Sequence, residues 1–331
     1  MLAAFKQGND VTLSETRCPD LKPGQIRARV DACGICGTDI HSQPTDEKEP
    51  FGHEVAGTVL ECGLGVEHLH VGQRVVLDSA TPCGRCDACK NGQQELCTDI
   101  QSFWFIPSFG FAEEMVAPAI CAIPCDDLSP EVACLQEPLG VALDLARLTE
   151  ITPDSNVLVM GQGPIGLMAT ALARRSGARR VFATELKERR NRVELSRAFG
   201  AHACFDPQAV PLDTFDFGCH IDRIMVTAPP QTLPSAIAVA AKGGLISFIG
   251  IGFDESAKIT FDADAFHFKK LQLRASFASP ALFGPQALRL LREDEVDGAA
   301  LITHQFPLKE MKQAMDVARN DMNAVKVVVR P

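Results

Sequence analysis

The chain has 331 residues, an apolar fraction of 46% and a formal net charge of −10. Such a length predicts about two domains with a substantial buried core. The negative charge argues against a nucleic-acid-binding surface, because the release of counterions from phosphates requires clustered Lys and Arg. No run of about eighteen apolar residues is present, so no membrane span is expected.

The cysteine content indicates a reducing compartment. There are 13 cysteines, an odd number that argues against a complete disulfide framework. The first residues, MLAAFKQGND, turn polar too early for the apolar region of a signal peptide. We therefore expect a cytoplasmic protein whose cysteines are thiols and metal ligands.

The first part of the chain is predicted to be mostly β. Short apolar-rich runs bounded by Gly, Pro or Asp predict strands at residues 2–5, 25–30, 55–61 and 74–77.

The segment 33–57, CGICGTDIHSQPTDEKEPFGHEVAG, brings together side chains that suit a catalytic metal. Its candidates are one thiol, one hydroxyl, two imidazoles and one carboxylate: Cys36, Thr38, His41, His53 and Glu54. Zinc binds sulfur, nitrogen and carboxylate oxygen, and a catalytic site keeps one position open. Cys33, Cys36 and His53 are alternatively ordinary core residues. The combination of Cys-x-Thr-x-x-His with Gly-His-Glu favours a metal site.

The segment PCGRCDACKNGQQELC predicts a second, structural zinc site. Its ligands are Cys83, Cys86, Cys89 and Cys97. Four thiolates fill a tetrahedral zinc, so the site has no catalytic position. A zinc-ribbon nucleic-acid module has similar ligands, but here only Arg85 and Lys90 supply positive charge and no aromatic residue is available for stacking.

Two further stretches have open interpretations. The aromatic run 103–111, FWFIPSFGF, contains the sole Trp and is either core or one apolar wall of a substrate cleft. The dipeptide Glu137-Pro138 fits a helix start, where an acid near the positive end of the dipole is favourable.

A dinucleotide-binding turn is predicted after residue 156. The apolar run VLVM is followed by Gly161, Gln162, Gly163, Pro164, Ile165 and Gly166, and then by a helical pattern. The glycines allow the turn, the approach of a pyrophosphate and close helix packing. A second strand, RRVFAT, ends before Glu185, an acid placed to bind the adenosine ribose hydroxyls.

The segments that follow alternate between helix and strand patterns. Helices are predicted near 188–199 and 233–241, and strands near 222–226, 245–249 and 271–274. This alternation predicts a parallel doubly wound sheet. Helices near 286–291 and 308–318 and a last strand, AVKVVV, are predicted to return to the first domain.

The cofactor choice depends on the charges after the second strand. Glu185 repels the 2′-phosphate of NADP and therefore favours NAD. Lys187, Arg189 and Arg190 follow closely and can instead neutralise a phosphate, which keeps NADP possible. Their simpler role is the solvated first turns of a helix.

The whole chain resembles the zinc-dependent medium-chain alcohol dehydrogenases, in the branch of sorbitol, threonine and sugar dehydrogenases. The motifs CGICGTDIH, GHEVAG, QEPLG and GQGPIG and the four-cysteine lobe carry this resemblance. It implies an α/β fold in which a β-rich GroES-like catalytic domain, residues 1–138 and 276–331, holds the structural-zinc lobe. Residues 139–275 would form the doubly wound Rossmann domain.

The resemblance also implies residue roles. Cys36 and His53 match catalytic zinc ligands, Glu54 matches the adjacent acid that binds or exchanges at the metal, and Glu137 matches a further ligand. Thr38 would receive the substrate proton, and His41 would pass it to solvent. With the structural site this makes two zinc ions per chain. The implied cofactor contacts are Gly161, Gly163, Pro164, Ile165, Gly166, Glu185 and Arg190.

The expected activity is hydride transfer from a secondary alcohol of a polyol, sugar or cyclitol to NAD, in a homodimer or homotetramer. Alternatives are an NADPH-dependent ketone reductase and a non-catalytic redox sensor. Two departures bear on the substrate: the segment between His41 and Gly52 is short, and SFGFAEE lacks the usual glycine pair before Phe-Ala-Glu.

Overall fold

The computed structural model describes residues 1–41, 46–252 and 254–331. The chain forms two units, one comprising Met1–Gly140 with Ala278–Pro331 and the other Val141–Phe277. The predicted divisions lie after residues 138 and 275. Part of the short segment after His41, residues 42–45, lies outside the described residues. In the described ranges, no helix combines the length and apolar character that crossing a membrane requires.

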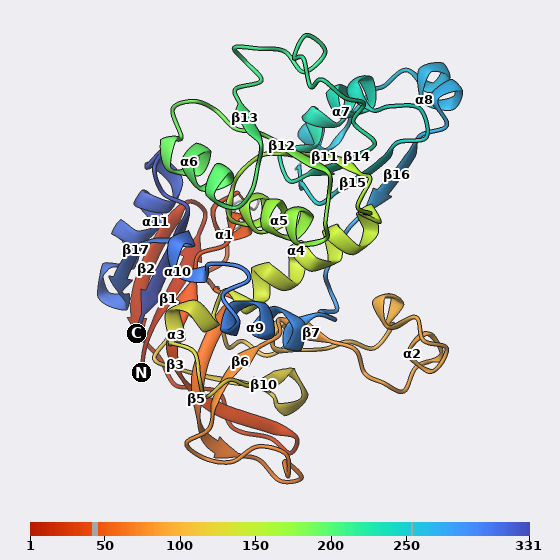
Figure 1. Ribbon diagram of the computed structural model, residues 1–331. Coiled ribbons are helices and arrows are strands. Elements are labelled where there is room, and N and C mark those ends of the chain that lie inside the picture. Colours follow the sequence, from red (N-terminus) through yellow and green to blue (C-terminus); the bar gives the residue numbers. More distant parts are fainter. Residues whose placement is uncertain (42–45, 253) are drawn as a thin grey trace. The chain divides into compact units, whose positions relative to one another are not determined.

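The first unit is built on a seven-stranded sheet (Figure 1). Its order is β10 (Ala122–Pro124), β6 (Arg74–Leu77), β5 (Glu54–Cys62), β3 (Gln25–Gly34), β18 (Lys326–Arg330) and β17 (Ile302–Pro307), and β9 (Glu114–Pro118) also pairs with β3. The last strand, β18, is antiparallel to β3, with Val329 opposite Cys33. The C-terminal segment thus pairs with a strand of the first unit.

Smaller elements surround this sheet. They are the strands β1 (Leu2–Gln7), β2 (Asp10–Glu15), β4 (Glu49–Pro50), β7 (Ala80–Thr81) and β8 (Gln101–Ser102), and the helices α1 (Gly37–His41), α2 (Asp87–Lys90), α3 (Pro130–Ala133), α9 (Gly284–Arg292), α10 (Gly298–Leu301) and α11 (Met311–Asn320). Alternate residues of a strand face opposite sides, so Ile26, Ala28 and Val30 of β3 are buried. Ile26 and Val30, with Val59 and Met115, belong to the apolar core that stabilises the unit.

The second unit is a six-stranded parallel sheet. Its order is β13 (Ala203–Phe205), β12 (Arg180–Thr184), β11 (Asn156–Met160), β14 (Arg223–Val226), β15 (Leu245–Phe248) and β16 (Gln272–Ala275). Its helices are α5 (Pro164–Arg175), α6 (Arg190–Ala198), α7 (Leu233–Val239) and α8 (Ala263–Lys269), and α4 (Gln136–Thr149) begins in the first unit and ends in this one. The doubly wound prediction is confirmed.

Sequence patterns missed several strands, namely β2, β4, β7, β8, β9, β10, β13 and β17. β13 has only three residues, and all of them are half-buried. β17, ITHQFP, contains no fully buried residue, so neither a long apolar run nor a clear alternation marks it. Pairing with β18 stabilises it instead.

Candidate metal and cofactor sites

The first predicted metal ligand, Cys36, follows strand β3. The strand ends at Gly34, and the amide of Ile35 donates to Val327 O of β18 at 2.9 Å. Helix α1 begins at Gly37, so Cys36 lies in the turn between the strand and the helix. Thr38 and His41 are both exposed and lie three residues apart on α1, a spacing that places them on one face.

His53 lies directly before β5 and contacts Cys36. The residue is 6% exposed. Burial acts to lower the pKa of His53, but the charge of Cys36 and a side-chain hydrogen bond with it raise the pKa well above its ordinary value, with further contributions from Asp39 and Glu137. His53 Nδ1 is buried and makes no hydrogen bond within the described residues. The structure therefore brings together the predicted sulfur and nitrogen donors.

Asp39 was missed by sequence reasoning. Its Oδ2 accepts a hydrogen bond from the Cys36 amide at 2.9 Å, and its Oδ1 lies 3.8 Å from His53 Nδ1. Burial raises the pKa of Asp39, and the charge of His53 opposes that rise. A carboxylate beside the second nitrogen of a metal-binding histidine is the usual orienting group. The available signal was its position three residues after Cys36.

Glu54 is held by a buried lysine. Lys326 Nζ lies 2.7 Å from each of the two Glu54 oxygens and 3.0 Å from Ile35 O. The side chains of Glu54 and Lys326 are 1% and 2% exposed. A Cβ at Gly34 would lie 2.0 Å from Glu54 Oε2, so only glycine leaves room for this carboxylate. The signal for Lys326 was a single cation in the apolar run AVKVVV.

Glu137 lies in the first turn of α4. Burial raises the pKa of Glu137 to about 7, and the charge of His53 is the main opposing influence. Thiol, imidazole and carboxylate donors thus share one region of the first unit, and these donor types fit a catalytic zinc. However, their ligand atoms do not form a group in which all atoms lie within 4.8 Å of one another. Within the described ranges, only the four cysteines meet this distance criterion. The ligand roles of Cys36, His53, Glu54 and Glu137 stay predictions.

The four cysteines of the α2 segment are arranged for a metal. The sulfur atoms of Cys83, Cys86, Cys89 and Cys97 lie within 4.8 Å of one another. The amides of Arg85 and Cys86 donate to Cys83 Sγ at 3.4 and 3.3 Å. Backbone hydrogen bonds from Cys89 and Thr98 lower the pKa of Cys86 to about 6, which favours the thiolate form that binds zinc.

The aromatic run divides into core and surface residues. Phe103 and Phe111 are 0% and 1% exposed, whereas Trp104 and Phe105 are 50% and 73% exposed. The centroid of the Trp104 ring lies 5.3 Å from the centroid of the His53 ring. The core interpretation therefore holds for the two phenylalanines. Trp104 offers an exposed aromatic surface beside a predicted metal ligand, and its role as a wall of a substrate cleft stays a prediction.

The glycine turn has the predicted geometry. Strand β11 ends at Met160, and Gly161 has φ +90°, a conformation that favours glycine. A Cβ at Gly166 would lie 2.0 Å from Gly161 O, so the third glycine allows the close packing of α5. Pro164 occupies the first turn of α5, as predicted. The amides at this helix start suit a pyrophosphate.

The surroundings of Glu185 were only partly foreseen. Its carboxylate accepts hydrogen bonds from the backbone N–H groups of Gln162 at 3.0 Å and Leu186 at 2.8 Å. Arg189 Nε and Arg192 Nη1 lie 3.9 and 3.8 Å from its oxygens. Arg190, the predicted cofactor contact, is exposed. Sequence reasoning missed Arg192, which is the third residue of α6.

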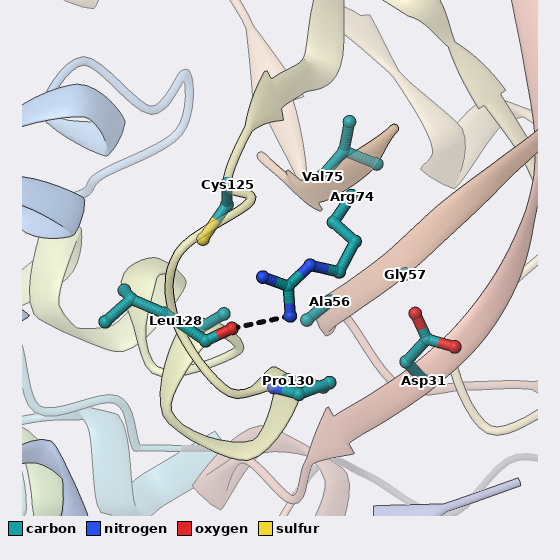
Figure 2. A pocket seen from close by; sticks show the side chains of 9 residues that line it. Asp31, Ala56, Gly57, Arg74, Val75, Cys125, Leu128 and Pro130 are labelled. Atoms are coloured by element: carbon teal, nitrogen blue, oxygen red, sulfur yellow. Dashed lines mark hydrogen bonds between the residues drawn. The ribbon is translucent and has the colours of Figure 1, made fainter. Parts of the chain in front are cut away.

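A small cavity lies away from all these residues. It has a volume of about 10 Å³ and lies beside Arg74, whose guanidinium donates to Leu128 O at 3.0 Å (Figure 2). This space holds at most one water molecule. Its lining contains none of the predicted metal or cofactor residues.

Comparisons with known proteins agree with this arrangement. Residues 22–127 match the family model described as alcohol dehydrogenase GroES-like domain, and residues 164–293 match zinc-binding dehydrogenase. Sorbitol dehydrogenase of Arabidopsis thaliana is 30% identical, covering 99% of this chain and 94% of that protein. L-Idonate 5-dehydrogenase of Vitis vinifera is 30% identical, covering 94% and 89%.

A solved structure shows the same fold. It is an alcohol dehydrogenase of Escherichia coli in complex with NADH, 26% identical, with a TM-score of 0.90 and coverage of 100% of this chain and 99% of that one. The first family match contains every predicted metal residue except Glu137, and the second contains the predicted cofactor residues from Pro164 onward. The sorbitol dehydrogenase is matched along nearly its full length. The chain therefore belongs to the zinc-binding alcohol dehydrogenase family and is an oxidoreductase.

Proposed function

We propose that the protein is a zinc-dependent dehydrogenase that oxidises a secondary alcohol of a polyol, sugar or cyclitol to the ketone with NAD(P). The contact between Cys36 and His53, beside the exposed Thr38 and His41, is the observation that carries this proposal. The names of the two relatives, sorbitol and L-idonate 5-dehydrogenase, support the substrate class.

The residues of the first unit would have separate roles in the reaction. Cys36, His53 and Glu137 would hold a zinc ion, which would supply a Lewis acid able to lower the pKa of a secondary hydroxyl. The Thr38 hydroxyl accepts the substrate proton, and His41, on the same face of α1, passes it to solvent. Asp39 orients His53 by facing its Nδ1. Glu54, anchored by Lys326, fixes the start of β5 next to His53.

The second unit would hold the cofactor. The amides at the start of α5 bind the pyrophosphate, and Gly163 allows its close approach. A nicotinamide held there would supply the hydride acceptor. Gln162 and Leu186 fix the carboxylate of Glu185 at the end of β12, where the adenosine ribose is bound in this fold.

The active form is proposed to be a cytoplasmic homodimer or homotetramer. Strand β16 lies at one end of the parallel sheet, and within the described part of the chain it pairs only with β15. Phe268 and Phe277 near this edge are 73% and 75% exposed. An apolar sheet edge favours association with a second copy. Light scattering on the purified protein measures the assembly size, and a monomer would contradict this part.

The activity is tested with the purified, zinc-replete protein. NAD and NADP reduction is measured across hexitols, pentitols, aldoses, inositols, amino-cyclitols, threonine and simple alcohols. We expect turnover on one group. Cys36→Ala should remove one zinc per chain and lower turnover at least about a hundredfold, since ligand loss exceeds the effect of outer-shell changes. Cys62→Ala, a half-buried cysteine of the same unit, is the matched control. Full turnover without that zinc would refute the mechanism.

A second candidate is the reverse reaction, a ketone reductase using NADPH. The pair Arg189 and Arg192 beside Glu185 is the observation that favours it. Ketones of the same substrate groups are therefore assayed with NADPH and NADH. Cofactor binding without turnover in either direction would instead support the redox-sensor hypothesis.

A further inference from the structure

Asp78 directly follows strand β6 and is buried against the first residue of α4. Its Oδ1 accepts a hydrogen bond from Gln136 Nε2 at 2.8 Å. Asp78 and Gln136 are 6% and 1% exposed. A Cβ at Gly284, the first residue of α9, would lie 2.8 Å from Gln136 Nε2 and 3.1 Å from Asp78 Oδ1, so glycine leaves the room that this pair requires. The pair is thus closely packed between β6, α4 and α9.

The start of α4 contains the predicted metal ligand Glu137. This residue follows Gln136 directly and lies in the first turn of the helix. A hydrogen bond that fixes the Gln136 side chain therefore restrains the backbone that carries the Glu137 carboxylate. Groups that keep ligands in place affect metal affinity although they do not touch the metal.

Stability alone does not account for an acid at position 78. The charge of Asp78 acts to raise the pKa of Glu137, and the charge of Glu54 acts in the same direction. Like charges close together in a buried region disfavour one another, and a buried carboxylate also loses its hydration. An apolar residue after β6 would avoid both costs. The bond to Gln136 therefore indicates a role for Asp78 beyond folding.

The next residue along the chain supports another side of the same site. Ser79 O accepts a hydrogen bond from Ser102 Oγ at 2.6 Å, and the Trp104 N–H donates to Ser102 Oγ at 2.9 Å. The Trp104 ring lies beside the ring of His53. The two residues that follow β6 are thus bonded both to the start of α4 and to the segment that faces His53.

We propose that Asp78 is a positioning residue of the catalytic metal site: through Gln136 it keeps Glu137 where the Glu137 carboxylate can bind zinc. Asp78 itself contacts neither metal nor substrate in this role. The inference rests on the proposed function, in which Glu137 is a zinc ligand, and it adds the residue that orients this ligand.

The test measures zinc binding in the full chain and does not depend on turnover. The zinc ion that Cys36→Ala removes is the one followed, and competition with a chelator gives its dissociation constant. Gln136→Met keeps the length of the side chain but removes the donor, and it should weaken this zinc about tenfold. Asp78→Asn keeps an oxygen that can accept from Gln136, so it should stay within about threefold of the unmodified protein.

A double variant separates positioning from folding. Asp78→Leu combined with Gln136→Met removes both polar partners, so this pair leaves no unsatisfied group and the midpoint of thermal unfolding should be close to that of the unmodified protein. The link between β6 and α4 is nevertheless lost, and zinc should again bind about tenfold more weakly. If Gln136→Met alone does not fold, the double variant decides.

Gln73→Met is the matched control. Gln73 is a half-buried glutamine of the same unit, and its Oε1 accepts from the His70 N–H at 3.2 Å. This variant should leave the zinc dissociation constant unchanged. Glu137→Gln is the reference for loss of the ligand and should weaken zinc binding more than Gln136→Met does.

Two results would overturn the inference while Glu137→Gln still weakens zinc binding. One is an unchanged zinc dissociation constant in folded Gln136→Met. The other is a double variant that regains zinc affinity together with stability, which would show that the pair acts only on folding. An unchanged constant in Glu137→Gln would instead refute its ligand role in the proposed function, and the positioning role with it. Zinc binding that responds as expected, without turnover of any alcohol or ketone, would support the inference and contradict only the proposed activity.

Discussion

Lys326 Nζ lies 2.7 Å from both carboxylate oxygens of Glu54, and the two side chains are 2% and 1% exposed. Burial acts to lower the pKa of Lys326, but the charge of Glu54 acts in the opposite direction. The net effect raises the pKa, so the lysine is a cation in the folded protein. The pair joins the start of β5 to β18, and thus connects the segment after His53 with the last strand of the chain.

Replacing Lys326 with Met should strongly destabilise the first unit. The substitution keeps the length of the side chain but leaves Glu54 buried without its cation. Loss of one partner of a buried pair costs about 3–5 kcal/mol. Urea unfolding followed by circular dichroism measures this loss.

The exposed Lys312→Met on α11 is the control, and we expect a change within about 0.5 kcal/mol. Glu54→Gln combined with Lys326→Met should recover part of the loss, because no buried charge then remains unpaired. A fully additive double variant would contradict the pairing.

Replacing Asp39 with Asn should weaken catalytic zinc binding about 10–100-fold, the usual effect of removing an orienting carboxylate. The Asn oxygen can still accept from the Cys36 amide, so only the negative charge facing His53 Nδ1 is lost. Zinc affinity is measured by competition with a chelator. Asp10→Asn, at an exposed position, is the control. Unchanged zinc affinity in Asp39→Asn would assign this residue a purely structural role.

Replacing Cys86 with Ser should remove the structural zinc, because hydroxyl oxygen is a poor substitute for a thiolate ligand. Elemental analysis should show one zinc fewer per chain. Since the site orders a lobe with little apolar core, we also expect the midpoint of thermal unfolding to fall by about 5 °C or more. Cys219→Ser, a free cysteine of the second unit, should keep full zinc content.

Asp78 should make stability depend on pH. Burial raises the pKa of Asp78 from 3.8 to about 6, although Gln136 Nε2 donates to its Oδ1 at 2.8 Å. Between these two pH values the folded protein keeps a proton that the unfolded chain releases. The free energy of unfolding therefore falls as the pH rises from about 4 to 6, by up to about 3 kcal/mol.

Asp78→Asn removes this ionisation and keeps an oxygen that can accept from Gln136. The variant should be more stable than the unmodified protein at pH 7.5 and about equal to it at pH 4. Urea unfolding at both pH values measures the difference. The exposed Asp316→Asn should not alter the pH profile in this way. A variant destabilised at pH 7.5 would show that ionised Asp78 contributes favourably.

The sequence alone determined the features that depend on local pattern. The parallel sheet followed from alternating strand and helix periodicities. Gly161 and Pro164 indicated the cofactor turn, because glycine readily adopts a positive φ and proline favours the first turn of a helix. The four cysteines also predicted a shared site from local pattern, because a short loop must bring their sulfur atoms together. They are Cys83, Cys86, Cys89 and Cys97.

Tertiary structure alone decided which distant side chains meet. Lys326 reaches Glu54 across 272 positions of the chain, because β18 returns beside β3, and no local pattern encodes that contact. The engagement of Glu185 by Gln162 and its approach to Arg192 likewise depend on how β11, β12 and α6 are placed. Periodicity specifies which residues face inward, whereas burial and the pairing of charges depend on which strands and helices pack together.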